Sequence, residues 1–177
     1  RKIAFPIKLS QRSGMGLAAM PFERKKMSET LILICTHGCF GQEIINSASM
    51  IVGEMKDVQS VSLPKGMDPI VYRQKIECVL EEAKDKNVFC MVDLFGGTPC
   101  NMAASLLSVR KFQIVSGLNL AMLLEVMIRR DHVPFEQLMA VALKALSSSG
   151  FDVGKRLKEM QLMKGEEKNG ADKTCTN

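Results

Sequence analysis

The sequence lacks any apolar run that approaches the roughly 18–20 residues needed to cross a bilayer as a helix, so we expect no membrane-inserted segment. The continuous apolar runs 31–35 and 88–92 have the length of single β-strands. The sequence also has no visible internal repeat and no linker that would separate two domains. With 177 residues, 46% of them hydrophobic and 24% charged, the chain has the composition of one globular domain of ordinary size.

The basic residues that a nucleic-acid-binding domain needs on its folded surface are also missing. The net charge is +5, but residues 1–26 contain seven Lys and Arg against the single acidic residue Glu23. The rest of the chain carries a net charge of −1, so we expect no nucleic-acid partner. We interpret 1–26 as a non-native or disordered N-terminal tail, 27–163 as a single domain and 164–177 as a flexible C-terminal tail. A targeting peptide is the alternative for 1–26, although its apolar pieces are short.

The six cysteines are preceded by no secretory signal and do not complete the usual spacing of a zinc site. Cys35, Cys90 and Cys100 lie in or beside apolar runs, so we expect reduced thiols that pack as small hydrophobic side chains in a cytoplasmic protein. Cys35, His37 and Cys39 would supply half of a zinc site, but the second pair of ligands is absent at the usual spacing. We therefore expect neither a metal nor a cofactor.

Short apolar runs alternate with longer segments of helical periodicity. Strands are predicted at 31–36, 58–63, 88–93 and 111–116, and helices at 42–56, 69–86, 99–109, 119–130, 135–149 and 153–163. This alternation with short connections is typical of an α/β fold, here an open, doubly wound, mostly parallel sheet with helices on both faces. We expect the strand order 2-1-3-4.

Three loops follow the ends of predicted strands: 36–38, 93–99 and 116–119. In doubly wound sheets, ligands bind beyond the carboxyl ends of the strands, at the point where the strand order reverses. With the order 2-1-3-4, this point lies between the first and third strands. His37 and Asp93 would then face each other across the crevice.

The residue types in these loops suit the acceptance of a phosphoryl group. A histidine that attacks phosphorus needs one free ring nitrogen, and Asp93 can accept the N–H of the other nitrogen of His37 and so fix the tautomer. Two glycines let the backbone approach the incoming oxyanion, and the helix that begins after Thr98 offers free N–H groups. No second base or metal-binding carboxylate cluster accompanies them, which favours an acceptor over a hydrolase. The predicted phosphate-binding residues are Thr36, Gly38, Gly96, Gly97 and Thr98.

Each of these residues also has a purely structural interpretation. His37 can be a satisfied surface residue, Asp93 can cap its own loop, and Gly96 and Gly97 can form a tight turn. His132 lies in a polar segment and is expected to be solvated. Phe40, Phe95 and Met122 are expected to border an exposed His37, with burial in the core as the alternative for Met122.

Three segments resemble, in the right order, the motifs of the mannose/fructose/sorbose-type IIA domains (EIIA-Man family) of the bacterial phosphoenolpyruvate-dependent sugar phosphotransferase system. They are residues 33–38, 92–101 and 117–123, and the similarity spans roughly residues 29–150. The resemblance implies that His37 accepts a phosphoryl group from phospho-HPr and passes it to a IIB component. That component phosphorylates sugar as the membrane components IIC and IID import it. Asp93 would orient His37, and Thr98 stands where the family commonly has Ser or Thr.

The resemblance further implies a homodimer whose subunits exchange a C-terminal strand, which would add a swapped antiparallel edge strand to the sheet. Cys35 stands where the family often has Gly, Ala121 where it often has Pro, and Cys39 adds a thiol to the loop. We expect any IIB partner to be a separate chain.

Two alternatives remain. The phosphotransfer subunit of phosphoprotein-dependent dihydroxyacetone kinase resembles this fold and uses a strand-end histidine, but it does not usually carry the motif at 96–99. The other alternative is a non-catalytic regulatory domain that binds a partner helix.

Overall fold

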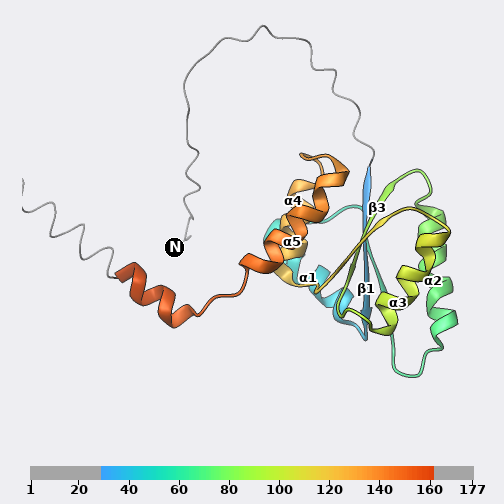
Figure 1. The fold of residues 1–177 in the computed structure, drawn as a ribbon, viewed down its shortest axis with the longest axis horizontal. Coiled ribbons are helices and arrows are strands. Elements are labelled where there is room, and N and C mark those ends of the chain that lie inside the picture. The colour runs from blue at the N-terminus through green and yellow to red at the C-terminus, as the bar shows by residue number, and fades with distance from the viewer. Residues whose placement is uncertain (1–28, 162–177) are drawn as a thin grey trace, which may run out of the picture.

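The fold is built on a four-stranded parallel sheet in the order β2-β1-β3-β4, shown in Figure 1. The computed structural model describes residues 29–161, and the predicted tails 1–26 and 164–177 lie outside the described residues. The strands are β1 (Thr30–His37), β2 (Val58–Leu63), β3 (Asn87–Val92) and β4 (Gln113–Ser116). This confirms the α/β fold class and the predicted strand order.

Helices cover both faces of the sheet (Figure 1). One face packs against α2 (Pro69–Glu82) and α3 (Thr98–Ser105), and the other against α1 (Phe40–Val52), α4 (Leu120–Arg129) and α5 (Leu138–Ser148). Two short 3₁₀ turns, η1 (Leu106–Ser108) and η2 (Phe135–Gln137), follow α3 and precede α5. The single helix predicted over 135–149 therefore begins as a 3₁₀ turn, after the extended residue Pro134.

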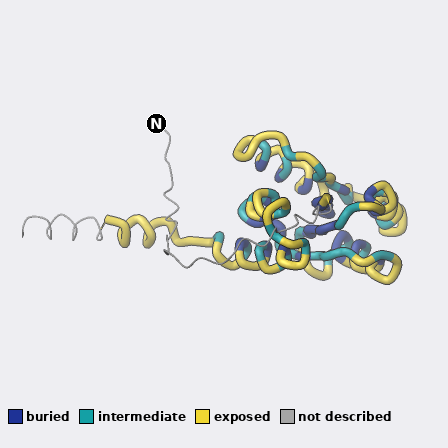
Figure 2. The backbone as a smooth tube through the Cα atoms, turned by 90° about the horizontal axis from the view of Figure 1, so that it is seen from above, coloured by how far each residue is buried: buried dark blue, intermediate teal, exposed yellow. Residues whose placement is uncertain are grey.

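The central strand β1 is buried on both sides. Leu31, Leu33 and Cys35 face the layer of α2 and α3, whereas Ile32 and Ile34 face the layer of α1, α4 and α5. This burial explains why the strand is a continuous apolar run in the sequence. In Figure 2 the buried segments run along the sheet and the inner sides of the helices.

Three of the cysteines pack in this core as predicted. Cys35, Cys90 and Cys100 are buried among the apolar side chains between the sheet and the α2–α3 layer, and none of the three forms a disulfide. A hydrogen bond with Cys35, and then burial, raises the pKa of Cys90 well above its usual value. The Cys90 side chain is therefore a neutral thiol at physiological pH, without the reactivity of a thiolate.

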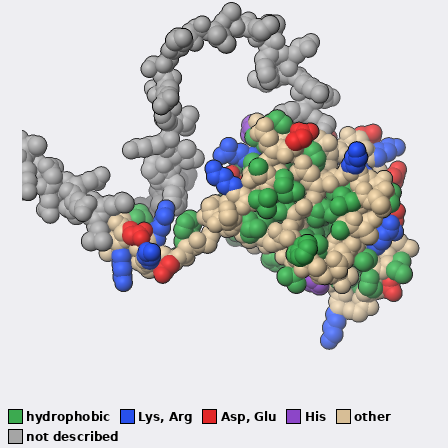
Figure 3. All heavy atoms as spheres, viewed as in Figure 1, with side chains coloured by type: hydrophobic (Ala, Val, Ile, Leu, Met, Phe, Trp, Pro, Cys, Tyr) green, Lys and Arg blue, Asp and Glu red, His purple; other side chains and the backbone are tan. Residues whose placement is uncertain are grey.

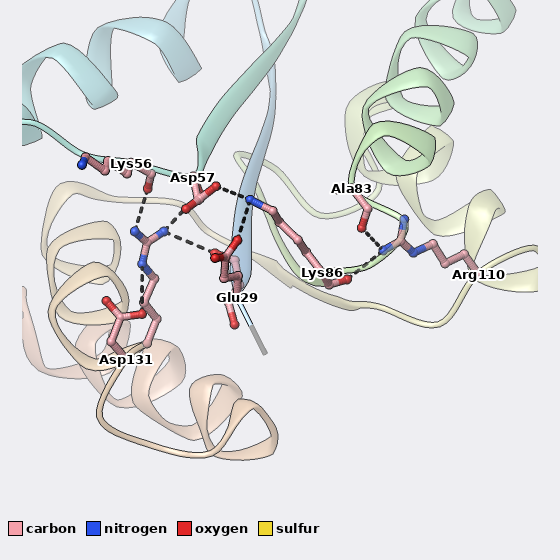
Figure 4. A network of polar contacts seen from close by, with 9 residues as sticks. Glu29, Lys56, Asp57, Ala83, Lys86, Arg110 and Asp131 are labelled. Atoms are coloured by element: carbon pink, nitrogen blue, oxygen red, sulfur yellow. Dashed lines mark hydrogen bonds and ion pairs between the residues drawn. The ribbon is translucent and has the colours of Figure 1, made fainter. Parts of the chain in front are cut away.

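A polar network closes the edge of the sheet at which β1, β2 and β3 begin (Figure 4). The Arg130 guanidinium donates to the backbone carbonyls of Thr30 at 3.3 Å, Asp57 at 3.1 Å and Lys56 at 2.6 Å. Lys86 bridges the carboxylates of Asp57, at 2.5 Å, and Glu29, at 3.1 Å. Arg110 donates to the carbonyls of Leu80, Ala83 and Lys86 at the end of α2. Arg130 and Arg110 bind backbone carbonyls and Lys86 binds two carboxylates, so we assign this edge a structural role.

After α5 the chain leaves the layers around the sheet and forms a helix at residues 153–161, every one of which is exposed (Figures 1 and 2). Asp152 stabilises the start of this helix, because its carboxylate accepts the backbone N–H of Lys155 at 2.9 Å. The expected antiparallel edge strand is therefore not found among residues 29–161, where the C-terminal segment is helical instead. None of the described helices is both long and apolar enough to cross a membrane.

Candidate active site

His37 and Asp93 meet where the strand order reverses, as the sequence predicts. His37 ends β1, and Asp93 follows the last residue of the neighbouring strand β3. The His37 Nδ1 atom lies 2.9 Å from Oδ2 of Asp93, and the same oxygen accepts the backbone N–H of His37 at 2.8 Å. Oδ1 accepts the backbone N–H of Leu94 at 2.9 Å. Both carboxylate oxygens thus have donors, and the carboxylate is fixed in one orientation.

This contact determines which nitrogen of the neutral ring is free. An ionised carboxylate can only accept hydrogen bonds, so in the neutral imidazole of His37 Nδ1 carries the proton and Nε2 keeps its lone pair. The His37 side chain is 48% exposed and the Asp93 side chain 16% exposed. The His37 ring is therefore half-exposed, while the carboxylate that contacts it is largely covered.

Gly97 lies directly against the His37 ring. A Cβ atom added to Gly97 would lie 3.5 Å from Nε2 of His37 and only 2.8 Å from Cε1, so the His37 ring would have to shift. Gly97 is also the N-cap of α3. The first N–H groups of a helix have no partner within that helix, so the backbone donors at the start of α3 lie beside the free ring nitrogen. Thr98 is the first residue of α3 and half-buried, and Pro99 follows it without an N–H to offer.

The other predicted phosphate-binding residues have different positions. The Thr36 side chain is fully buried, and its Oγ1 accepts the backbone N–H of Gly41 at 2.8 Å. This contact gives the Thr36 hydroxyl a role in holding the start of α1, and a phosphate contact of Thr36 stays a prediction. Gly38 and Gly96 both have positive φ values, +55° and +77°, and turn the chain in the two loops that flank His37.

The residues expected around His37 divide into exposed and buried ones. Phe40 is 43% and Phe95 82% exposed, as predicted for a rim. Met122 is fully buried in the layer of α1, α4 and α5, so its placement on the rim is wrong and its alternative placement in the core is confirmed. Met122 lies one turn into α4, and its backbone N–H donates to the capping side chain of Asn119 at 2.8 Å. His132 is exposed, as expected.

Sequence reasoning missed one residue beside the site. Asn101, in α3, donates from Nδ2 to the carbonyl of Gly96 at 2.9 Å. The sequence signal for this contact was the position of Asn101, five residues after Gly96 and just inside a predicted helix, from which a side-chain amide can reach back to the loop. Among residues 29–161, no group of three or more His, Cys, Asp and Glu side chains is placed to hold a metal ion.

Known proteins are similar to this chain in sequence and in fold. Residues 31–143 match the family described as PTS system fructose IIA component. The fructose-specific EIIA component of the PTS of Bacillus subtilis (strain 168) is 34% identical over 124 residues, which cover 69% of this chain and 84% of that protein. The mannose-specific EIIAB component of Escherichia coli (strain K12) is 29% identical over 116 residues, which cover 64% of this chain but only 36% of that protein.

The same family is found among solved structures. The mannose/sorbose-specific IIA subunit of the phosphotransferase system from Enterococcus faecalis has a TM-score of 0.65 to this chain and is 32% identical. The match covers 72% of this chain and 96% of that structure. Sequence and structure agree that this chain belongs to the PTS fructose IIA (EIIA-man) family, whose members are phosphotransferases that serve as phosphocarriers in sugar uptake.

Proposed function

We propose that His37 accepts a phosphoryl group from phospho-HPr on Nε2 and passes it to a IIB component for coupled sugar uptake and phosphorylation. The observation that carries this proposal is the 2.9 Å contact between His37 Nδ1 and Asp93, which leaves Nε2 free on a half-exposed ring. The family relationship supports the same chemistry and does not favour the dihydroxyacetone kinase subunit or the regulatory domain.

In the proposed step, the Nε2 lone pair attacks phosphorus, a P–N bond forms, and the bond between phosphorus and the donor protein breaks. The imidazole ring gains positive charge as this bond forms, and Asp93 stabilises that charge through Nδ1–H. The oxygens of the transferred group carry negative charge, which the free N–H groups and positive dipole end of α3 stabilise. The Thr98 hydroxyl supplies a further donor at the start of this helix. Transfer to IIB is the same step in reverse, with the partner's acceptor as the nucleophile.

Transfer between proteins requires a site that a partner can cover. Three large apolar side chains close to His37 in the sequence or in its partner loop are exposed: Phe40 at 43%, Leu94 at 61% and Phe95 at 82%. Figure 3 shows hydrophobic side chains grouped over the body of the domain, with charged side chains largely at its margin. Apolar side chains at a protein interface exclude water from the reacting groups, which protects a labile phosphoramidate during transfer.

The direct test is incubation with phosphoenolpyruvate, the general phosphorylating enzyme of the system and HPr. We expect one phosphoryl group per chain, on Nε2 of His37, identified by nitrogen-resolved NMR. The phosphoramidate should be labile in acid, where the ring becomes a better leaving group, and more persistent in base. Phosphate on Nδ1 would contradict the role given to Asp93. A chain that accepts no phosphate would contradict the whole proposal and favour a non-catalytic binding domain.

We expect Gly97→Ala to slow phosphoryl acceptance by about 10²-fold, the loss typical of an ångström-scale displacement of a reacting group. Gly97 has a φ of −68°, which alanine adopts without strain, so the effect arises from the contact of the new methyl group with the His37 ring. The rate of labelling by phospho-HPr measures it. Gly150→Ala is the matched control, because a Cβ at Gly150 meets nothing within 4 Å. Equal rates for the two variants would show that Gly97 does not constrain the ring.

We further propose that residues 27–163 act as a single domain in the cytoplasm, as a homodimer that reaches the membrane components IIC and IID through IIB. One feature supports pairing of two copies. The segment after α5 exposes four large apolar side chains, which are Phe151, Val153, Leu157 and Met160. Such side chains are rarely left uncovered together on a short segment. A second copy of this chain could cover them with apolar side chains of its own.

A further inference from the structure

The loop that joins β3 to α3 is held by few packing contacts. Leu94 is 61% and Phe95 82% exposed, so burial of apolar surface does little to fix this loop. At its first end, the Asp93 carboxylate binds the backbone N–H of Leu94 and that of His37. At its second end, the chain passes through Gly96 and Gly97, and glycine is the residue type with the widest choice of backbone angles. Without a further contact, the peptide between them would adopt several orientations.

The side chain of Asn101 supplies that contact. Its Nδ2 donates to the Gly96 carbonyl at 2.9 Å, and its backbone N–H donates to the Gly97 carbonyl at 2.9 Å. The carbonyl of Gly96 and the N–H of Gly97 belong to one planar peptide group, so fixing one fixes the other. That N–H donates back to the Leu94 carbonyl at 3.3 Å and closes the turn.

This peptide group leads into the candidate site. Gly97 lies against the His37 ring, and the next residue, Thr98, begins α3. The N-cap of α3 is a glycine, which has no side chain that could fix the entry of the chain into the helix. Asn101 does so from inside the helix, by reaching back to the loop.

We propose that Asn101 is a positioning residue that locks the Gly96–Gly97 peptide and so preorganises the His37 ring and the donors of α3 for the phosphoryl group. The proposal rests on the proposed function and adds a residue that acts only through its neighbours. The lock removes the cost of ordering two glycines during the transfer step, so its effect falls on the rate of transfer and leaves the docking of the donor protein unchanged.

Two substitutions test the lock. Asn101→Ala deletes the donor, and Asn101→Asp keeps the shape while placing an oxygen against the Gly96 carbonyl. We expect both to lower kcat for phosphoryl acceptance about ten- to hundredfold and to leave KM for phospho-HPr within about twofold. Asn101 is exposed, so the melting temperature should stay close to that of the wild type. Asn46→Ala is the matched control: Asn46 is also an exposed helical asparagine, and its hydrogen bonds go to Gln42 and Glu43 of its own helix.

A second readout does not depend on activity. In the unphosphorylated protein, we expect amide hydrogen exchange at Gly97 to become faster in both Asn101 variants and to stay unchanged in Asn46→Ala. Wild-type kcat together with unchanged exchange at Gly97 would overturn the lock. A loss confined to Asn101→Asp would also overturn it, because the added charge alone would then explain the effect. If the wild type itself accepts no phosphate, the proposed function fails, and the exchange of Gly97 alone decides whether the lock exists.

Discussion

Replacing His37 with alanine is expected to abolish phosphoryl acceptance and to leave the fold intact. The side chain is 48% exposed at the end of β1, and exposed substitutions typically change the free energy of unfolding by no more than about 0.5 kcal/mol. The substitution also leaves no orphaned charge, because Asp93 Oδ2 still accepts the backbone N–H of residue 37, at 2.8 Å in the wild type. The loss of labelling would then reflect the missing nucleophile and nothing else.

The measurement is transfer of labelled phosphate from phospho-HPr, together with a thermal unfolding curve of each protein. His132→Ala is the control, since His132 is exposed and lies in a turn after α4. We expect it to be labelled at the wild-type rate. Labelling that persists in His37→Ala and disappears in His132→Ala would transfer the acceptor role to His132 and remove the basis of the proposed function.

Substituting Asp93 with asparagine is expected to slow acceptance by about 10²-fold or more without preventing it. All three groups that contact this carboxylate are N–H donors: two from His37 and one from Leu94. An asparagine amide has only one oxygen, so its NH₂ group must face a donor in either orientation. When the NH₂ faces His37, it favours the tautomer that places the proton on Nε2 and blocks attack. The corresponding change in the Ser-His-Asp triad costs about 10⁴-fold, and we expect less here because the backbone donors of α3 remain.

Two observations separate an orienting role from a loop cap. The rate of labelling gives the size of the effect, and the nitrogen chemical shifts of His37 report which ring nitrogen carries the proton. Asp131→Asn is a suitable control, because Asp131 is 73% exposed and lies 3.8 Å from its ionic partner Arg130. A rate for Asp93→Asn within about threefold of the control, with an unchanged tautomer, would reduce Asp93 to a residue that shapes its own loop.

The sheet could be predicted from the sequence because its signals are local. Continuous apolar runs identified the central strands β1 and β3, and the alternation of short strands with helical periodicity identified the class of fold. The placement of His37 beside Asp93 then followed from one assumption about strand order, which the structure confirms. The strands and the fold class were inferred from residues that lie within a few positions of one another. The placement of His37 beside Asp93 was inferred from a general rule for doubly wound sheets.

The details that could not be predicted depend on contacts between distant segments. The close approach of Gly97 to the His37 ring brings together two loops that are 60 residues apart in the chain. No motif spacing in the sequence indicates this contact. The direction of the Thr36 hydroxyl is similar, because it depends on how closely α1 approaches the sheet at Gly41. For Met122 a local signal was misleading. Its proximity to a loop motif in the sequence suggested a place beside His37, whereas its position in the first turn of α4 directs its side chain into the core.

The pairing of β1 with β3 makes the candidate site a property of the tertiary structure alone. His37 and Asp93 are 56 positions apart, and they come together only when these two strands have formed their parallel ladder. Parallel strands pair late compared with helices, because closing the intervening chain costs entropy before any contact compensates for it. A refolding chain that has formed its helices but not its sheet therefore holds His37 as an ordinary exposed imidazole, without a fixed tautomer or oxyanion donors. Under the proposed function, phosphoryl acceptance would thus report native strand pairing, and the time at which a refolding chain becomes phosphorylatable would mark the completion of the β1–β3 ladder.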